Sequence, residues 1–203
     1  MKYKLIVFDF DGTIADSMDT YIDLARKFFP SKKHLITREN IRNTGMRTLL
    51  KEFKISGIKL LFVLIFFRFY AAAIIRKLKP QPGLKKVLIK ISKSQRIGIL
   101  SSNSVSNIKE FLSRNDIECF DFVESSPLYF GKEKKIREIA EKQKLKPFEI
   151  AYVGDEQRDL EAANSAGVSA FAVSWGTESA KLLSMANPTK IFTKPEQMIK
   201  YFL

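Results

Sequence analysis

The sequence of 203 residues predicts an α/β fold, with a central parallel sheet between layers of helices and an all-helical segment inserted after the first strand. Two observations lead to this prediction. From Gly83 onward, short apolar runs alternate with helical segments, which is typical of a parallel sheet covered on both faces. Between the first strand and Pro80, apolar residues follow helical spacing only. The length fits one domain with an insertion or two small domains.

The first strand is predicted at Leu5–Phe8, four apolar residues in succession that indicate burial on both faces of a sheet. It ends in Asp9 and Asp11, separated by Phe10. Residues two apart on extended backbone point the same way, so both carboxylates should project from the carboxyl end of this strand. Two adjacent acids repel each other unless a cation lies nearby or one of them is protonated. An ordinary turn is the alternative interpretation of this Asp-x-Asp-Gly stretch.

The inserted segment contains only helix signals. The predicted helices are Ile14–Phe29, a second from Thr37 to Gly45, and a nearly continuous stretch over Thr48–Lys79 that is broken at Ser56-Gly57. Residues 60–67 are the most apolar window of the chain, but Lys59 and Arg68 bracket only eight residues. A membrane-spanning helix needs about 20, so the window predicts the inner face of a helical cap, or a surface that docks on a partner or a membrane.

The remaining chain alternates helices and strands. Helices are predicted at Leu84–Ser92, Val105–Asn115, Lys132–Lys144, Asp159–Ala166 and near Glu178–Met185, and strands at Ile97–Leu100, Phe120–Val123, Ile150–Val153 and Ala170–Val173.

Composition sets limits on function and location. A single cysteine, Cys119, excludes a disulfide within the chain, and the amino terminus lacks a signal-peptide pattern, so we expect a cytoplasmic protein. The net charge of +13 comes largely from fourteen Lys and Arg between Leu24 and Pro80. These residues carry no nucleic-acid-binding signature, so a solvated basic face is favoured over nucleic-acid binding. They also predict a preference for anionic substrates.

Polar residues follow three of the predicted strands. After Asp9 and Asp11 come Ser101-Ser102-Asn103 behind the second strand and Gly154-Asp155 behind a later one, with Asp159 four residues on. Ligands of open α/β sheets bind at the carboxyl ends of strands, where all three sets should meet. A cluster of carboxylates without a Cys/His set suits Mg²⁺ rather than Zn²⁺.

These residues resemble the four motifs of the haloacid dehalogenase-like hydrolase superfamily: Asp9–Thr13, Ser101, Lys132 and Gly154–Asp159. Tyr152–Asp155, Ala162-Ala163, Ala166-Gly167 and Trp175-Gly176 are similar to its phosphoglycolate-phosphatase-like branch. The resemblance implies a Rossmann-like three-layer core formed by residues 1–15 and 81–203, and a small α-helical cap formed by residues 16–80.

The resemblance also implies roles for single residues. Asp9 would be the nucleophile that forms an aspartyl-phosphate, and Asp11 the general acid and base. An Asp at this second position implies phosphatase or mutase chemistry rather than dehalogenation. The phosphoryl group would be bound by Ser101 and Lys132, together with the neighbouring Gly12, Thr13, Ser102 and Asn103. Lys134 and Lys135 are alternatives to Lys132.

The implied metal is Mg²⁺, held by the side chains of Asp9 and Asp155, the backbone carbonyl of Asp11, and Asp159 directly or through water. The expected function is therefore a Mg²⁺-dependent phosphatase acting on a small phosphorylated metabolite. Two alternatives stay open at this point. One is a phosphomutase or phosphotransferase of the same family, and the other is a binding protein that docks through its basic, hydrophobic cap on a membrane or partner, a reading that the complete set of motif side chains disfavours. The sequence does not predict the oligomeric state.

Overall fold

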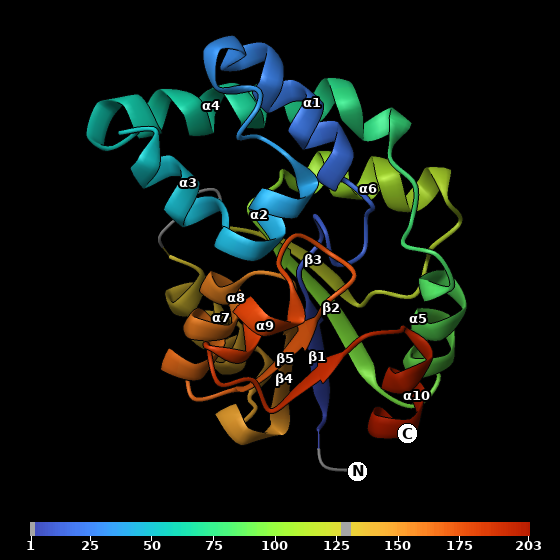
Figure 1. Ribbon diagram of the computed structural model, residues 1–203. Helices are drawn as coiled ribbons and strands as arrows, with labels where there is room; N and C mark the ends of the chain where they lie inside the picture. The colour runs from blue at the N-terminus through green and yellow to red at the C-terminus, as the bar shows by residue number, and fades with distance from the viewer. Residues whose placement is uncertain (1–2, 127–130) are drawn as a thin grey trace.

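The computed structural model describes residues 3–126 and 131–203 and contains one parallel sheet of six strands, in the order β3-β2-β1-β4-β5-β6 (Figure 1). β1 (Leu5–Phe8) is central, between β2 (Arg96–Ser101) and β4 (Ile150–Gly154). β3 (Phe122–Ser125) extends one side, and β5 (Ser169–Val173) and β6 (Lys190–Phe192) extend the other. All four β1 residues are buried, so the predicted central strand is confirmed.

Side chains of β1 alternate between two hydrophobic cores, one on each face of the sheet. Ile6 and Phe8 pack with α5 (Leu84–Ser92), α6 (Val105–Arg114) and α10 (Glu196–Phe202). Leu5 and Val7 pack with α7 (Lys132–Gln143), α8 (Gln157–Ser165) and α9 (Ala180–Ser184). This strict alternation follows from the two-residue period of a strand and produces the predicted three layers.

The segment between β1 and α5 is helical and lies over one end of the sheet (Figure 1). It consists of α1 (Met18–Phe28), α2 (Arg38–Thr44), α3 (Met46–Glu52) and α4 (Gly57–Ile74), with short 3₁₀ turns at Pro30–Lys32 and Ile75–Lys77. Thr37 begins α2 as predicted, its hydroxyl accepting the N–H of Asn40 at 3.1 Å. The helices enclose a small apolar core of their own around Met18, Ile22 and Leu49.

This helical insert leaves and rejoins the rest of the chain at one place. The Asp16 N–H donates to the Lys79 carbonyl at 2.8 Å, and the Gln81 N–H donates to the Ile14 carbonyl at the same distance. The two connections therefore run side by side, directly after the loop that carries Asp9 and Asp11.

The sequence prediction missed two elements and shifted others. Neither β6 nor α10 was expected. β6 has only three residues, too few to show a periodicity. α1 begins at Met18 rather than Ile14, since the residues before it form the loop after β1. β3 begins two residues later than predicted.

The segment Gly57–Lys77 is long and apolar enough to cross a membrane by length and composition, the one such helix in the described part of the chain. Its inner face packs on the insert, where Val63 and Ala71 are buried.

Candidate active site

The polar residues predicted to meet at one sheet edge do so. Asp9 and Asp11 follow β1, Ser101 ends β2, and Asp155 follows β4, so all of them lie at the carboxyl ends of adjacent parallel strands. The helical insert lies above this edge (Figure 1). Parallel strands point their carboxyl ends the same way, which places residues far apart in the sequence next to each other.

Three buried carboxylates form the centre of the site. One oxygen each from Asp9, Asp155 and Asp159 lies within 4.8 Å of the others. Lys132 Nζ lies 3.2 Å from Asp9 Oδ2 and 2.6 Å from Asp159 Oδ1, and its side chain is only 8% exposed. One cation against three carboxylates leaves an excess of negative charge in a buried place.

This charge imbalance affects the protonation of the acids. Burial raises the pKa of Asp9 to about 7, although Lys132 opposes the shift. Burial also disfavours the charged form of Asp159, but Lys132 outweighs it and lowers the pKa of that carboxyl. Lys132 itself stays charged, because Asp159 and Asp9 overcome the effect of burial and raise its pKa.

The cluster fits a divalent cation. Asp9 Oδ1 is buried without a hydrogen-bond partner among the described residues, and an orphaned carboxylate oxygen is costly unless a ligand or ion contacts it. The donor atoms are all oxygen, which suits a hard cation such as Mg²⁺. The Asp11 side chain is not part of this set of three.

Asp155 is held by hydrogen bonds from two threonines. From the sequence, Thr13 was assigned to substrate binding and Thr177 was not singled out. The Thr13 hydroxyl donates to Asp155 Oδ1 at 2.8 Å, and the Thr177 N–H donates to Asp155 Oδ2 at 2.7 Å. Thr13 is also expected to bind substrate, and its buried side chain donates to Asp155.

Gly12 is required by this close packing. It has a φ of +75°, and a Cβ at this position would lie 2.0 Å from Asp155 Oδ2. Its N–H donates to the Ala15 carbonyl at 2.9 Å. Gly12 therefore shapes the loop, and its expected contact with substrate stays a prediction.

Asp11 is oriented by Asn103. The Asn103 amide donates to Asp11 Oδ2 at 3.0 Å, while Asn103 Oδ1 accepts from the Ser104 N–H and the Asn107 amide. Burial raises the pKa of Asp11, against the effect of the Asn103 bond. Asp11 Oδ1 has no hydrogen-bond partner in the described part of the chain. The structure thus gives Asn103 a hydrogen bond to Asp11, while its expected contact with the phosphoryl group stays a prediction.

Ser101 is buried at the end of β2, where its hydroxyl accepts the N–H of Asn103 at 3.2 Å. Of the three candidate lysines, only Lys132 reaches the carboxylates. Lys134 is exposed, and Lys135 pairs with Glu124 and Glu138, both at 3.1 Å.

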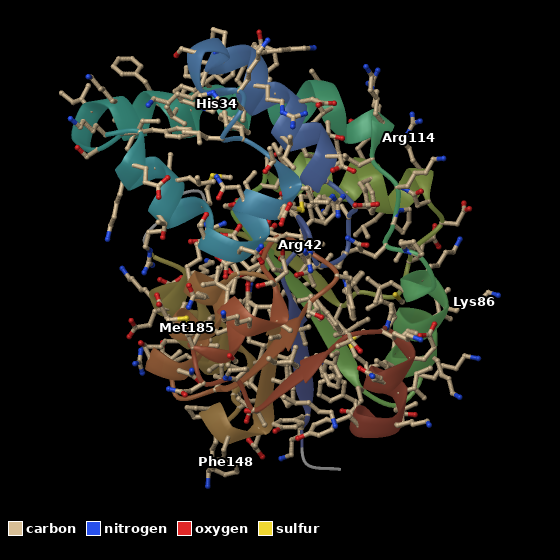
Figure 2. The ribbon with its side chains drawn as sticks, viewed as in Figure 1. His34, Arg42, Lys86, Arg114, Phe148 and Met185 are labelled. Carbon is tan, nitrogen blue, oxygen red and sulfur yellow. The ribbon has the colours of Figure 1, made fainter. Side chains whose placement is uncertain are left out.

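Contacts between the insert and the core close the site from above. Arg42 of α2 donates to the carbonyls of Ser174, at 2.8 Å, and Gly176, in the loop after β5 (Figure 2). Trp175 of the same loop donates its indole N–H to the Thr13 carbonyl at 3.1 Å. Sequence reasoning missed Arg42, because nothing local distinguishes it from the other basic residues of the insert.

Comparisons with known proteins agree with this geometry. Residues 6–173 match the family model described as haloacid dehalogenase-like hydrolase. The chain is 30% identical to a phosphoglycolate phosphatase of Synechococcus elongatus over 203 residues, covering 97% of this chain and 96% of that one.

Solved structures share the fold. A haloacid dehalogenase-like hydrolase family protein from Streptococcus pneumoniae superposes with a TM-score of 0.80 at 24% identity, covering 100% of this chain and 99% of that one. A predicted phosphatase from Clostridium acetobutylicum gives a TM-score of 0.78 at 19% identity, covering 99% and 98%.

Proposed function

The chain belongs to the haloacid dehalogenase-like hydrolases and is a phosphatase, and from this premise we propose that it hydrolyses a small phosphorylated metabolite in a Mg²⁺-dependent reaction through an aspartyl-phosphate on Asp9. The observation that carries the proposal is the orphaned Asp9 Oδ1 in a buried acidic cluster beside Lys132. That oxygen has no competing donor among the residues that the structure describes, so it is available to attack phosphorus.

In the first step, Asp9 Oδ1 forms a bond to phosphorus and the bond from phosphorus to the alcohol oxygen breaks. Asp11 donates a proton to the departing oxygen. Burial raises the pKa of Asp11, which favours the protonated form that this step needs. In the second step Asp11 takes a proton from water, the water oxygen attacks phosphorus, and inorganic phosphate leaves Asp9 as a free carboxylate.

The remaining residues position the acids and offset negative charge on the phosphoryl group. Lys132 holds Asp9 and offsets negative charge on the phosphoryl oxygens, and Ser101 and Ser102 lie at the end of β2 beside them. Asn103 orients Asp11, and Thr13 orients Asp155. When bound by Asp9, Asp155, the Asp11 carbonyl and Asp159, Mg²⁺ supplies positive charge that lowers the repulsion between carboxylate and phosphate.

The division into two domains belongs to the same proposal. We assign residues 1–15 and 81–203 to the catalytic core and residues 16–80 to a cap. Support comes from the separate apolar core of the insert and from its paired connections at residues 14–16 and 79–81.

The test is hydrolysis of p-nitrophenyl phosphate with and without Mg²⁺, by the wild type and by Asp9→Asn. We expect Mg²⁺-dependent release of inorganic phosphate that Asp9→Asn abolishes. Activity that survives this substitution would remove the nucleophile assignment. Transfer of phosphate to an added alcohol instead of water would identify a phosphotransferase.

A further inference from the structure

A cavity of about 230 Å³ extends from Asp11 into the helical insert. Its upper wall is formed by apolar side chains from α1 to α4, among them Met18, Ile22, Met46, Leu49 and Phe67. Its lower end is formed by Asp11, Ser102 and Asn103 of the proposed active site. A dry apolar cavity of about 150 Å³ is large enough to hold benzene, so this one can hold a small organic group.

The charges along the cavity do not suit an anionic alcohol. Arg158 is the one cationic side chain among its described lining residues, and it is paired with Glu156 at 2.6 and 3.2 Å. Asp11 and Glu156 add negative charge. No basic residue of the insert is among the described lining residues of the cavity, and Lys27, Lys51 and most of the others whose side chains are described are exposed. The net positive charge therefore does not reach the place where the alcohol part of a substrate would lie.

We propose that the substrate is the phosphate monoester of an apolar alcohol, whose alkyl or aromatic part fills this cavity while its phosphate faces Asp9. The proposal rests on the proposed function and names its substrate class. It departs from phosphoglycolate, whose leaving group carries a carboxylate that this cavity would leave unpaired beside Asp11 and Glu156.

The first measurement is calorimetric binding of ethyl-, butyl- and hexylphosphonate in the presence of Mg²⁺, which does not depend on turnover. Affinity should rise about fourfold for each added methylene until the cavity is full. Phosphonoacetate, which carries a carboxylate, should bind more weakly than butylphosphonate. Affinity that is flat with chain length, or strongest for phosphonoacetate, would overturn the proposal.

A matched pair of variants locates the effect. Met46→Gln replaces a half-buried lining residue with a polar one of similar size and should reduce hexylphosphonate affinity at least about threefold, with a smaller effect on ethylphosphonate. Met185→Gln makes the same change at a residue that is 71% exposed and lies away from the insert (Figure 2). Met185→Gln should change the affinity for neither hexylphosphonate nor ethylphosphonate. Equal effects of both variants would contradict the assignment.

Turnover of ethyl, butyl and hexyl phosphate then separates this proposal from the proposed function. Chain-length-dependent binding without hydrolysis of any ester would refute the phosphatase mechanism and leave the cavity assignment standing. Hydrolysis with no dependence of kcat/KM on chain length would refute the cavity assignment alone.

The outer face of α4 provides a second, independent observation. Ile58, Leu61, Phe62, Ile65 and Phe69 are between 52% and 78% exposed. Their spacing of three, four and seven residues places them on one side of the helix, where Ala72 and Ala73 continue the stripe. A contiguous exposed stripe of large apolar side chains marks an interaction surface.

Charge indicates what covers this outer face. Exposed basic residues lie before, within and after the helix: Lys51 and Lys54, then Lys59, then Arg76 and Lys77. Two copies of a chain with a net charge of +13 would bring like charges together across such a face. An anionic phospholipid surface accepts both the apolar stripe and the basic residues.

We infer that the outer face of α4 docks on an anionic bilayer, with the helix parallel to the membrane plane. On the inner face of α4, Val63 and Ala71 are buried and Phe67 packs against the apolar core of the insert, which excludes lipid contact all round the helix in this conformation. Ile58, Phe62, Ile65 and Phe69 would enter the headgroup region.

The test is sedimentation of the full chain with vesicles of phosphatidylglycerol and phosphatidylcholine, compared with phosphatidylcholine alone. We expect binding to the anionic vesicles that 0.5 M NaCl weakens. Phe62→Ser with Phe69→Ser should reduce it at least about tenfold. Phe148→Ser, at a residue that is 63% exposed at the opposite end of the molecule (Figure 2), should not.

Two results would overturn this inference. One is absence of binding to anionic vesicles by the wild type. The other is a dimer, measured by light scattering, that the double variant converts to a monomer, since a second copy would then cover the face.

Discussion

Replacing Lys132 by methionine removes a cation that is in direct contact with two of the buried acids. Lys132 Nζ contacts both Asp9 and Asp159, and all three side chains are at most 8% exposed. Breaking a buried ion pair by removal of one partner costs about 3–5 kcal/mol, because the other charge is left uncompensated. We therefore expect Lys132→Met to lower the free energy of unfolding by about this amount in the absence of divalent metal.

The pH dependence has a definite sign. In the wild type the pKa of Asp9 is raised from 3.8 to about 7, so its contribution to stability is fully present below pH 3.8 and is lost as the pH rises through 7. Without Lys132 the carboxyl groups of Asp9 and Asp159 would both titrate at higher pH. The variant should therefore lose more stability at pH 8 than at pH 5.

The assay is urea unfolding in EDTA at pH 5 and pH 8, repeated at pH 8 with Mg²⁺. Lys134→Met is the matched control, since Lys134 is exposed and two residues away, and its effect should stay within about 0.5 kcal/mol. Mg²⁺ should restore part of the loss. An equal loss at both pH values, or a loss no larger than that of the control, would refute the electrostatic account of the site.

Three further predictions concern the loops around the cluster. Gly12→Ala should lower kcat at least about 100-fold and lower the free energy of unfolding by more than about 2 kcal/mol. The reason is that the added Cβ would collide with Asp155, at a residue whose φ is +75°. Steady-state kinetics and urea unfolding measure the two effects, and wild-type values of both would contradict this close packing. Arg42→Gln should raise KM about fivefold with a smaller change in kcat. The reason is that Arg42 hydrogen-bonds the insert to the Ser174 carbonyl. An unchanged KM in steady-state kinetics would count against a role of this hydrogen bond in holding the insert over the site. Burial raises the pKa of Glu178 to about 8, so the wild type loses stability as the pH rises from 4.5 to 8, whereas Glu178→Gln does not titrate. The variant's free energy of unfolding should therefore rise relative to that of the wild type, by more than about 1 kcal/mol at pH 8. Urea unfolding across this pH range measures the difference, and a difference that stays constant with pH would contradict the prediction.

The sheet and the position of the acids could be predicted because both depend on local pattern. Leu5–Phe8 and Ile150–Gly154 are continuous apolar runs followed directly by acids, and parallel topology then brings Asp9 and Asp155 together. The missed β6 has only three residues, of which Phe192 alone is buried, so it shows no period to detect.

The supporting contacts could not be predicted because they join distant parts of the chain. Thr13 and Asp155 are separated by 142 residues, and Asn103 and Asp11 by 92. Residue type alone does not predict these partners. The structure shows Thr13 hydrogen-bonded to Asp155 and Asn103 hydrogen-bonded to Asp11.

The sequence of the insert also left two features unpredicted. α4 is apolar on all sides, so its sequence does not tell which side faces inward. The expected preference for anionic substrates relied on net charge and stays a prediction. Which described basic residues lie away from the cavity could be learned only from the structure.

The most direct test of the central claim is to trap the phosphorylated enzyme. The protein, loaded with Mg²⁺ and mixed with substrate, would be quenched in acid within milliseconds, reduced with borohydride, and digested for mass spectrometry. We predict modification at Asp9. With p-nitrophenyl phosphate, whose leaving group departs without a proton from Asp11, more should accumulate in Asp11→Asn because the base for the second step is lost. Continued phosphate release with no modified Asp9, or modification at another residue, would contradict it.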